Sequence, residues 1–300
     1  MPLVILQIQI SIMSNIQWFW YLGWSFTTLA LLGNGLVIFL VISKWIPRTT
    51  TNWLIMSLAV ADFCSVLSFL PPMFISNFHY EIDLSHAGLW YKICYTFMYS
   101  STANLCVLTA DRFIAVVKPL KYASLMKRRS PSLLICMAWL TSLIFFTLPS
   151  AFSYQGNESF TAIFEINRVF MFQVIPSIIF VLVTCILIYI SNKLQRQTTA
   201  LEAQVRYNYA FPKIDVIKNK RHPERRAAAM IILIITLFNA TYAGGNYVCY
   251  CFITTTCVIP YTLYKAIHLM MIINAAANPI VYAFLKKDIR KALLRLFIYN

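Results

Sequence analysis

Long apolar stretches separated by short polar ones dominate the chain. Seven of them reach the ~20 apolar residues that a helix needs to cross the ~30 Å core of a bilayer. The first, fourth and sixth contain no charged residue. The expected spans are 16–43, 53–76, 87–117, 131–152, 167–192, 227–250 and 261–285. The pattern predicts an all-α membrane protein folded as a seven-transmembrane helix bundle.

The last segment, 286–298, has a different pattern. Apolar Ile289, Leu293 and Leu296 alternate with Lys and Arg at helical spacing, which is typical of a short amphipathic helix lying in the membrane interface. A frayed continuation of the seventh span is the alternative. The other connections are short except for a polar, basic loop over 193–224, so we expect a single domain over 1–300.

Composition agrees with this prediction and excludes several classes of protein. The chain is 60% hydrophobic and 12% charged, whereas a soluble domain averages about 25% charged residues. The four His are scattered and no metal or nucleophile spacing appears. We therefore expect no enzyme.

The net charge of +15 is explained by topology. All but three of the 25 Lys and Arg fall in segments on one side of the predicted bundle; the exceptions are Lys92, Arg168 and Lys265. Short basic loops remain cytoplasmic, so a multi-pass protein of the plasma membrane is expected, with an extracellular N-terminus and a cytoplasmic C-terminus. The basic side would attract anionic membrane lipids. No nucleic acid partner is expected.

Short sequences stand in order along the predicted spans, over nearly the whole chain. They are Gly33-Asn34, Leu58 to Asp62, Asp111-Arg112-Phe113 with Pro119, Trp139 with Pro149, Pro176, and Asn278-Pro279-Ile280-Val281-Tyr282. In kind and spacing they resemble the rhodopsin-like (class A) G-protein-coupled receptor family. The resemblance implies a receptor that binds an extracellular ligand, either a peptide or a small molecule. Such a receptor activates a heterotrimeric G protein by outward movement of helix 6.

A membrane transporter or channel is the alternative function. It would need polar residues running through the bundle or paired inverted halves. Here the polar residues concentrate around Asp62 and at the inner face, which favours the receptor.

Asp62 lies in the middle of a span, where a lone carboxylate costs about 2.5–3.5 kcal/mol on insertion scales. Asn34 is expected at a depth from which it could reach Asp62. The resemblance implies a sodium ion that favours the inactive state, held by Asp62, Ser101, Asn274 and Asn278. A protonated Asp62 held by asparagine hydrogen bonds is the alternative. No other cofactor is expected.

The inner end of the third span carries Asp111 and Arg112. The resemblance implies that Arg112 is held by Asp111 and by Glu224 at the start of helix 6, and that breaking this contact opens a cavity for the G protein. A solvated charge cluster is the alternative. Pro279 favours a kink in the seventh span, and Asn278 and Tyr282 belong to the same switch.

Counting from these landmarks places an outer ligand pocket between helices 3, 5, 6 and 7. Its expected lining is Cys94, Tyr95, Met98, Tyr99, Arg168, Tyr242, Asn246 and His268. Receptors for cationic amines share an Asp at the position where this chain has Cys94. Opsins share a Lys at the position where this chain has Ile272. Both classes are therefore disfavoured, whereas an anionic ligand and a basic peptide both stay open.

The chain departs from the family in three places. Ala87 stands where a Cys usually begins the common disulfide. Tyr242 and Gly244 replace the usual Trp and Pro of helix 6, and Gly244-Gly245 can supply the bending that Pro would give. Thr184 replaces a Tyr of helix 5. These changes bear on the efficiency of switching and leave the fold unaffected.

Covalent modification is expected in the outer loops. Asn157-Glu158-Ser159 is a glycosylation acceptor in a short loop, whereas the similar Asn239 triplet lies inside helix 6 and should stay bare. A disulfide is expected within the third outer loop, joining Cys257 to Cys249 or Cys251.

Few hydroxyl groups face the predicted inner side. From Pro279 onward the chain has no Ser or Thr, and the long inner loop offers Thr198 and Thr199. Because arrestin docks on phosphorylated Ser and Thr in the family that the chain resembles, weak arrestin binding is expected.

Overall fold

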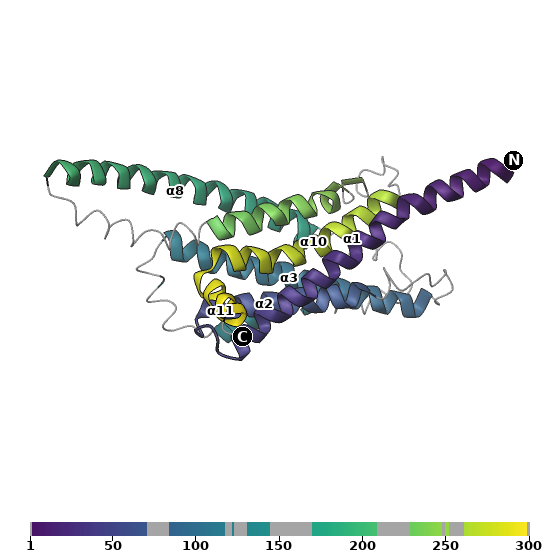
Figure 1. Cartoon of the computed structure of the whole chain (residues 1–300), viewed down its shortest axis with the longest axis horizontal. Coiled ribbons are helices and arrows are strands. Elements are labelled where there is room, and N and C mark those ends of the chain that lie inside the picture. The colour runs from purple at the N-terminus through teal and green to yellow at the C-terminus, as the bar shows by residue number, and fades with distance from the viewer. Residues whose placement is uncertain are drawn as a thin grey trace.

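The computed structural model shows helices in every long segment that it describes. It describes residues 2–70, 84–117, 122, 131–144, 170–208, 229–247, 250–251 and 261–298, and this part of the chain contains no strand. The elements are α1 (Pro2–Ile42), α2 (Thr50–Leu70), α3 (Leu84–Val117), α5 (Pro131–Ser142), η4 (Phe170–Val174), α8 (Ile175–Asn208), the Ala229–Tyr247 helix, α10 (Tyr261–Leu285) and α11 (Lys287–Ile298) (Figure 1).

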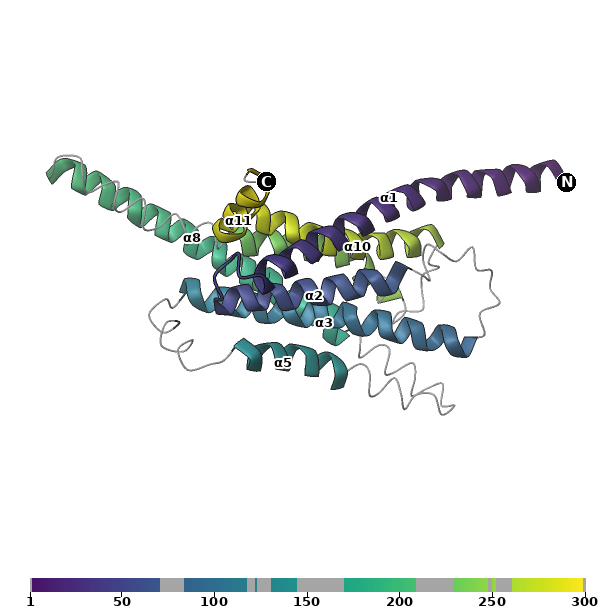
Figure 2. The same cartoon turned by 60° about the horizontal axis from the view of Figure 1, so that its bottom comes forward.

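The helices lie side by side as one bundle. Figures 1 and 2 show α1 and α8 extending beyond it at opposite ends, with α11 turned across the bundle where α10 ends. Within the described residues, four helical segments are long and apolar enough to cross a membrane: Phe19–Ile42, Thr50–Ser68, Ala229–Tyr247 and Lys265–Leu285. Pro131–Ser142 and Ile175–Ile190 are shorter apolar helices.

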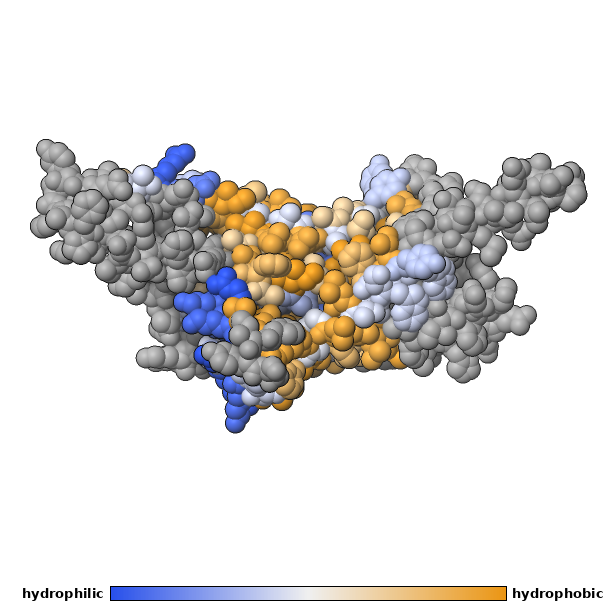
Figure 3. Space-filling view, viewed as in Figure 1, coloured by the Kyte–Doolittle hydropathy of each residue, from blue (hydrophilic) through white to orange (hydrophobic). Residues whose placement is uncertain are grey.

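The surface of the bundle carries an apolar belt. In Figure 3 hydrophobic residues cover its middle, and strongly hydrophilic residues gather at the end where α11 lies. Large side chains such as Leu32 and Phe284 are 70% and 72% exposed. We call the α11 end, with exposed Lys44, Arg48 and Lys287, the basic end. A helical bundle with an apolar outer belt confirms the predicted membrane fold.

Two helices extend more than ten residues beyond the spans that the apolar pattern predicted, whereas α2 and α3 each begin three residues early. α1 begins at Pro2 instead of residue 16, because apolar residues continue towards the N-terminus and proline fits the first position of a helix. α8 continues to Asn208 instead of residue 192. Its added part is rich in Gln, Ala, Leu and Arg, which are strong helix formers whether or not a membrane surrounds them.

Packing brings α2 to the centre of the described bundle, against α1 and α3, while α1 also lies along α10. A polar chain ties the middle of three helices together. Trp139 Nε1 of α5 donates to Ser57 Oγ of α2 (3.0 Å), and Ser57 Oγ donates to Asn104 Oδ1 of α3 (2.7 Å). Because lipid offers no hydrogen bonds, such contacts fix the helices relative to one another.

The Gly244-Gly245 pair lies in a continuous helix where neighbours approach closely. A Cβ atom at Gly244 would lie 2.8 Å from Cγ1 of Ile267 in α10, and one at Gly245 would lie 2.5 Å from Nε2 of Gln173 in η4. Small residues let membrane helices approach at such points. The pair was expected to supply bending; in this structure it permits close packing.

Candidate functional site

Asp62 of α2 is 1% exposed and lies between three helices. Ser101 Oγ of α3 donates to its Oδ1 atom. Asn278 Nδ2 of α10 donates to Oδ2 over 2.8 Å. The structure therefore joins Asp62, Ser101 and Asn278, which the sequence had placed at one depth.

Asn34 has other partners. Its Nδ2 atom donates to the carbonyl oxygens of Ala30 (2.9 Å) and Ala275 (3.0 Å). The side chain therefore joins α1 to α10, and its Oδ1 atom is buried without a hydrogen bond. Asn34 lies at the expected depth in the bundle, but its amide group donates to Ala30 and Ala275 instead of Asp62.

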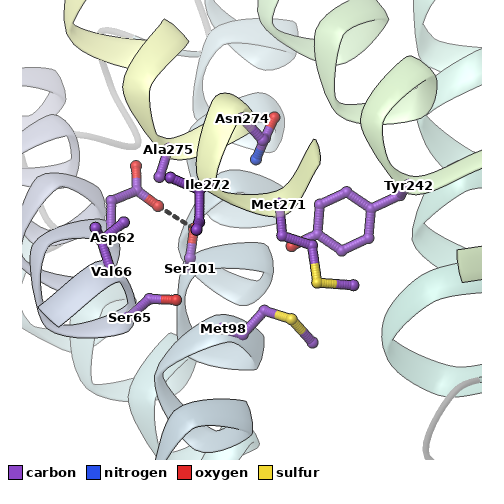
Figure 4. A pocket seen from close by; sticks show the side chains of 10 residues that line it. All are labelled: Asp62, Ser65, Val66, Met98, Ser101, Tyr242, Met271, Ile272, Asn274 and Ala275. Atoms are coloured by element: carbon purple, nitrogen blue, oxygen red, sulfur yellow. Dashed lines mark hydrogen bonds between the residues drawn. The ribbon is translucent and has the colours of Figure 1, made fainter. Parts of the chain in front are cut away.

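A cavity of about 10 Å³ opens beside Asp62, which is about the space of one water molecule or small ion. It is lined by Asp62, Ser65, Val66, Met98, Ser101, Tyr242, Met271, Ile272, Asn274 and Ala275 (Figure 4). The Oδ1 atom of Asn274 is buried without a hydrogen bond. A carboxylate, the hydroxyl groups of Ser65, Ser101 and Tyr242, and an unsatisfied amide oxygen around one small space fit a hard cation that prefers oxygen ligands.

The cavity does not fit a transition metal. Within the described ranges, no three His, Cys, Asp or Glu side chains gather where they could share an ion. Such metals are usually held by several nitrogen or sulfur ligands.

Arg112 lies at the basic end of α3 in a network of four side chains. Its Nε and Nη2 atoms donate to Asp111 Oδ2 over 2.9 and 2.7 Å. Nη2 also donates to Tyr122 Oη (2.8 Å) and to the Thr51 hydroxyl of α2. The guanidinium carbon lies 5.6 Å from the centre of the Tyr122 ring.

The same two hydroxyl groups also donate to the carboxylate. Tyr122 Oη donates to Asp111 Oδ1 (3.0 Å), and Thr51 Oγ1 donates to Asp111 Oδ2 (3.3 Å). Burial raises the pKa of Tyr122, with the Arg112 charge opposing, so the hydroxyl keeps its proton at neutral pH. We call Thr51, Asp111, Arg112 and Tyr122 the α3 clamp.

Sequence reasoning found Asp111 and Arg112 but missed Thr51 and Tyr122. The signal for Tyr122 was a phenol three residues after Pro119, close behind the charged pair. Glu224, the expected second partner of Arg112, lies outside the described residues, and this contact stays a prediction.

Lys286 adds positive charge near the clamp. It joins α10 to α11 and is partly buried. Burial, together with the nearby charge of Arg112, lowers the pKa of Lys286 to about 8. At pH 7 most molecules therefore still carry this charge, and fewer do so as the pH rises through 8.

The end of α10 holds the other expected switch residues. Pro279 lies inside the helix, and a Cβ atom at Gly33 of α1 would lie 2.9 Å from its Cβ atom. The Tyr282 side chain is fully buried and its hydroxyl has no hydrogen bond. A buried hydroxyl without a partner can gain one when its surroundings change.

The structure brings only some of the expected ligand-pocket residues to one cavity. Met98 and Tyr242 line the cavity described above. The Sγ atom of Cys94 donates to the Ser68 carbonyl oxygen of α2 (3.1 Å), and the residue is fully buried. Asn246 Nδ2 donates to Ser177 Oγ of α8 (3.3 Å).

Three further expected pocket residues, Tyr95, Tyr99 and His268, lie in α3 and α10. Tyr95 and Tyr99 stack with their ring centres 6.2 Å apart, and His268 is 4% exposed. Arg168 lies outside the described residues. The ligand pocket stays a prediction.

The expected modifications fall mainly outside the described residues. This holds for Asn157, Cys249 and Cys257, while Cys251 is buried; the glycosylation and the disulfide stay predictions. Asn239 Nδ2 donates to the Ile235 carbonyl oxygen within its own helix (3.0 Å), and the expectation that it stays unmodified remains a prediction.

The sequence of this chain is similar to those of known receptors. The profile of the family described as "7 transmembrane receptor (rhodopsin family)" matches residues 33–282. That range includes Asp62, the α3 clamp and Tyr282, so the match covers the site as well as the bundle.

Three curated receptors illustrate the similarity. The octopamine receptor beta-2R of Chilo suppressalis is 27% identical over 88% of this chain and 75% of its own length. The trace amine-associated receptor 8c of Mus musculus is 25% identical over 88% and 81%. The galanin receptor 2b of Danio rerio is 25% identical over 90% and 72%.

Proposed function

The chain belongs to the rhodopsin family of seven-transmembrane receptors, and from this premise we propose how it switches. It is a G-protein-coupled receptor of the membrane, and neither a transporter nor an enzyme. We propose that the resting state is held by the α3 clamp at the basic end. An extracellular ligand would shift the population to a state in which the Ala229–Tyr247 helix moves outward and Arg112 is released to the G protein.

This proposal rests on the hydrogen bonds that already occupy the Arg112 guanidinium group. Its side chain is 16% exposed and donates to the Asp111 carboxylate and to two hydroxyl groups. A guanidinium so held contributes little to a partner outside until these contacts break. The basic residues at this end also support its assignment to the cytoplasm, with the N-terminus outside.

We expect Tyr122→Phe to raise basal signalling. The change removes the hydroxyl that accepts a hydrogen bond from Arg112 and donates one to Asp111, but it keeps the ring. A hydrogen bond to a charged group contributes about 1.5–3 kcal/mol, so the active population should rise on the order of tenfold. Ligand-free G-protein activation in transfected cells, normalised to surface expression, measures the effect.

Tyr189→Phe is the matched control for this variant. Tyr189 of α8 is 65% exposed and lies outside the α3 clamp, so basal signalling should stay at the wild-type value. Equal basal signalling in Tyr122→Phe and wild type would argue against the clamp as a restraint on the receptor.

We further propose that the cavity beside Asp62 binds a sodium ion in the resting state. Asp62 supplies the negative charge, and Ser101 and Asn274 supply further oxygen atoms. Asn278 holds the carboxylate from α10. An ion there would stabilise the arrangement of α2, α3 and α10 that the structure contains.

The ligand is proposed to be other than a cationic amine, although several relatives are named for octopamine and trace amines. A buried ammonium group needs a carboxylate partner. In the part of the chain whose side chains are described, the acidic residues are Asp62, Asp111 and Asp288. Asp111 and Asp288 lie at the basic end, and Asp62 is held by Ser101 and Asn278. Cys94 instead faces α2.

We therefore expect octopamine and phenylalkyl trace amines to leave the receptor silent. The measurement is a concentration series in cells that express the chain with a promiscuous G protein. The octopamine receptor beta-2R in the same cells serves as the positive control. Activation of this chain by octopamine over the same concentrations would reverse the proposal and point to a carboxylate outside the described residues.

Two further partners are proposed. α11 buries Ile289 and Ala292 and exposes Lys287 and Lys291, which supports its contact with membrane lipids at the interface. Arrestin is proposed to bind weakly at the 193–224 loop, whose hydroxyl groups are those of Thr198 and Thr199 and of tyrosines.

A further inference from the structure

Tyr242 lies in the Ala229–Tyr247 helix, which is the sixth predicted span and is called helix 6 below, at a position where the resembling receptors usually have Trp. It is 3% exposed and belongs to the lining of the Asp62 cavity. In Figure 4 its hydroxyl group points into this cavity from one side, while Asp62 and Ser101 lie on the other. Among the lining residues, Tyr242 is the one that comes from the Ala229–Tyr247 helix.

Aromatic packing fixes this orientation. The Tyr242 ring stacks on Phe238, one turn along the same helix, with ring centres 4.2 Å apart and planes at 17°. Phe238 in turn packs edge to face against Phe180 of α8, with centres 5.0 Å apart. Such pairs prefer defined geometries. The stack and a side-chain hydrogen bond between Tyr242 and Thr102 of α3 together hold the hydroxyl group in place.

We propose that the Tyr242 hydroxyl is an oxygen donor of the cation site beside Asp62, so that a bound sodium ion ties helix 6 to α2, α3 and α10. The inference rests on the sodium site proposed above. The other oxygen donors, Asp62, Ser101 and Asn274, come from helices other than helix 6. An indole at this position would offer an N–H donor and no acceptor, whereas a phenol offers an oxygen lone pair to a cation or to its bound water.

In this arrangement the ion contacts the Ala229–Tyr247 helix, which is the helix proposed to move. An outward motion of the Ala229–Tyr247 helix withdraws the Tyr242 oxygen from the cavity and removes a donor from the ion. Sodium would then bind the resting state better than the active one. By linkage, that difference in affinity is the amount by which sodium favours the resting state.

The experiment measures thermal unfolding of the full-length, detergent-purified receptor over a sodium chloride series. N-methyl-D-glucamine chloride keeps the ionic strength constant. Wild type should gain melting temperature with sodium, and Asp62→Asn should show no gain. Tyr242→Phe should need about 2- to 10-fold more sodium for the half-maximal gain, the range of one hydrogen bond. Tyr247→Phe, which removes a hydroxyl from the same helix away from the cavity, should match wild type.

The outcomes separate this inference from the sodium site itself. If wild type shows no gain from sodium, both the site and the role of Tyr242 are wrong. If Asp62→Asn abolishes the gain but Tyr242→Phe equals wild type, the sodium site stands and the role of Tyr242 is wrong. Tyr242→Met, a flexible side chain without the ring or hydroxyl, should shift the half-maximal concentration in the same direction. A wild-type value in that variant also counts against the proposal.

Discussion

Arg112→Ala should abolish G-protein activation while the receptor still reaches the cell surface. In the proposed active state the guanidinium leaves the α3 clamp and becomes a donor for the G protein. Losing two charge-assisted hydrogen bonds, at about 1.5–3 kcal/mol each, lowers coupling by about 100-fold to 10,000-fold. The measurement is ligand-independent and ligand-stimulated nucleotide exchange on the G protein, divided by the surface density of receptor.

Folding should survive this change because Asp111 keeps two donors. Tyr122 Oη and Thr51 Oγ1 still reach its carboxylate in the absence of Arg112. Surface density is therefore expected to stay within about twofold of wild type, since the burial cost of the carboxylate is partly offset. Arg295→Ala, which removes an exposed charge of α11, is the control and should couple normally.

Arg112→Lys tests whether the planar group matters. Lysine keeps the charge but cannot offer the fixed fork of a guanidinium. Coupling should fall to a value between those of wild type and Arg112→Ala. Normal coupling in Arg112→Ala would remove the case for Arg112 as the contact of the G protein.

The membrane spans and the depth of most site residues could be predicted from the sequence. Each helical residue advances about 1.5 Å along the axis, so counting from Asp62, Arg112 and Asn278 places other residues at their depth. This is why Ser101 and Asn278 were expected beside Asp62 and are found there.

Rotation of a helix about its axis could not be predicted in the same way. Asn34 is at the expected depth, but its amide faces Ala275. Cys94 was expected to line a pocket, but its thiol faces the Ser68 carbonyl of α2. A helix turns through about 100° for each residue, so a small error in the assumed packing directs a side chain to another neighbour.

Residues between the predicted spans were the hardest to predict. Tyr122 lies between the third and fourth predicted spans, where hydrophobic periodicity gives no information about which side chains a residue contacts. Its place in the α3 clamp depends on its contacts with Arg112 and Asp111, which no pattern along the chain indicates. The role of Thr51 was missed for a related reason, because it depends on how the start of α2 meets the end of α3.

Gly33→Ala should destabilise the receptor through the contact between α1 and α10. The new Cβ atom would lie 2.9 Å from Cβ and 3.0 Å from Cγ of Pro279, closer than carbon atoms pack. The proline ring is rigid, so the two helices have to separate. Separation would also lengthen the hydrogen bond from Asn34 Nδ2 to the Ala275 carbonyl, now 3.0 Å. Overpacking of this kind costs about 1–3 kcal/mol.

The measurement is the melting temperature of purified receptor, together with its surface density in cells, and both should fall. Gly35→Ala is a matched control two residues along the same helix. Its Cβ atom would meet Cε2 of Phe63 at 3.7 Å, an ordinary van der Waals contact, and alanine favours a helix more than glycine does. That variant should melt at or slightly above the wild-type temperature. If both variants melted like wild type, the close approach of α1 to Pro279 would contribute nothing to stability. If both melted lower by equal amounts, the loss would come from α1 itself and not from its contact with α10.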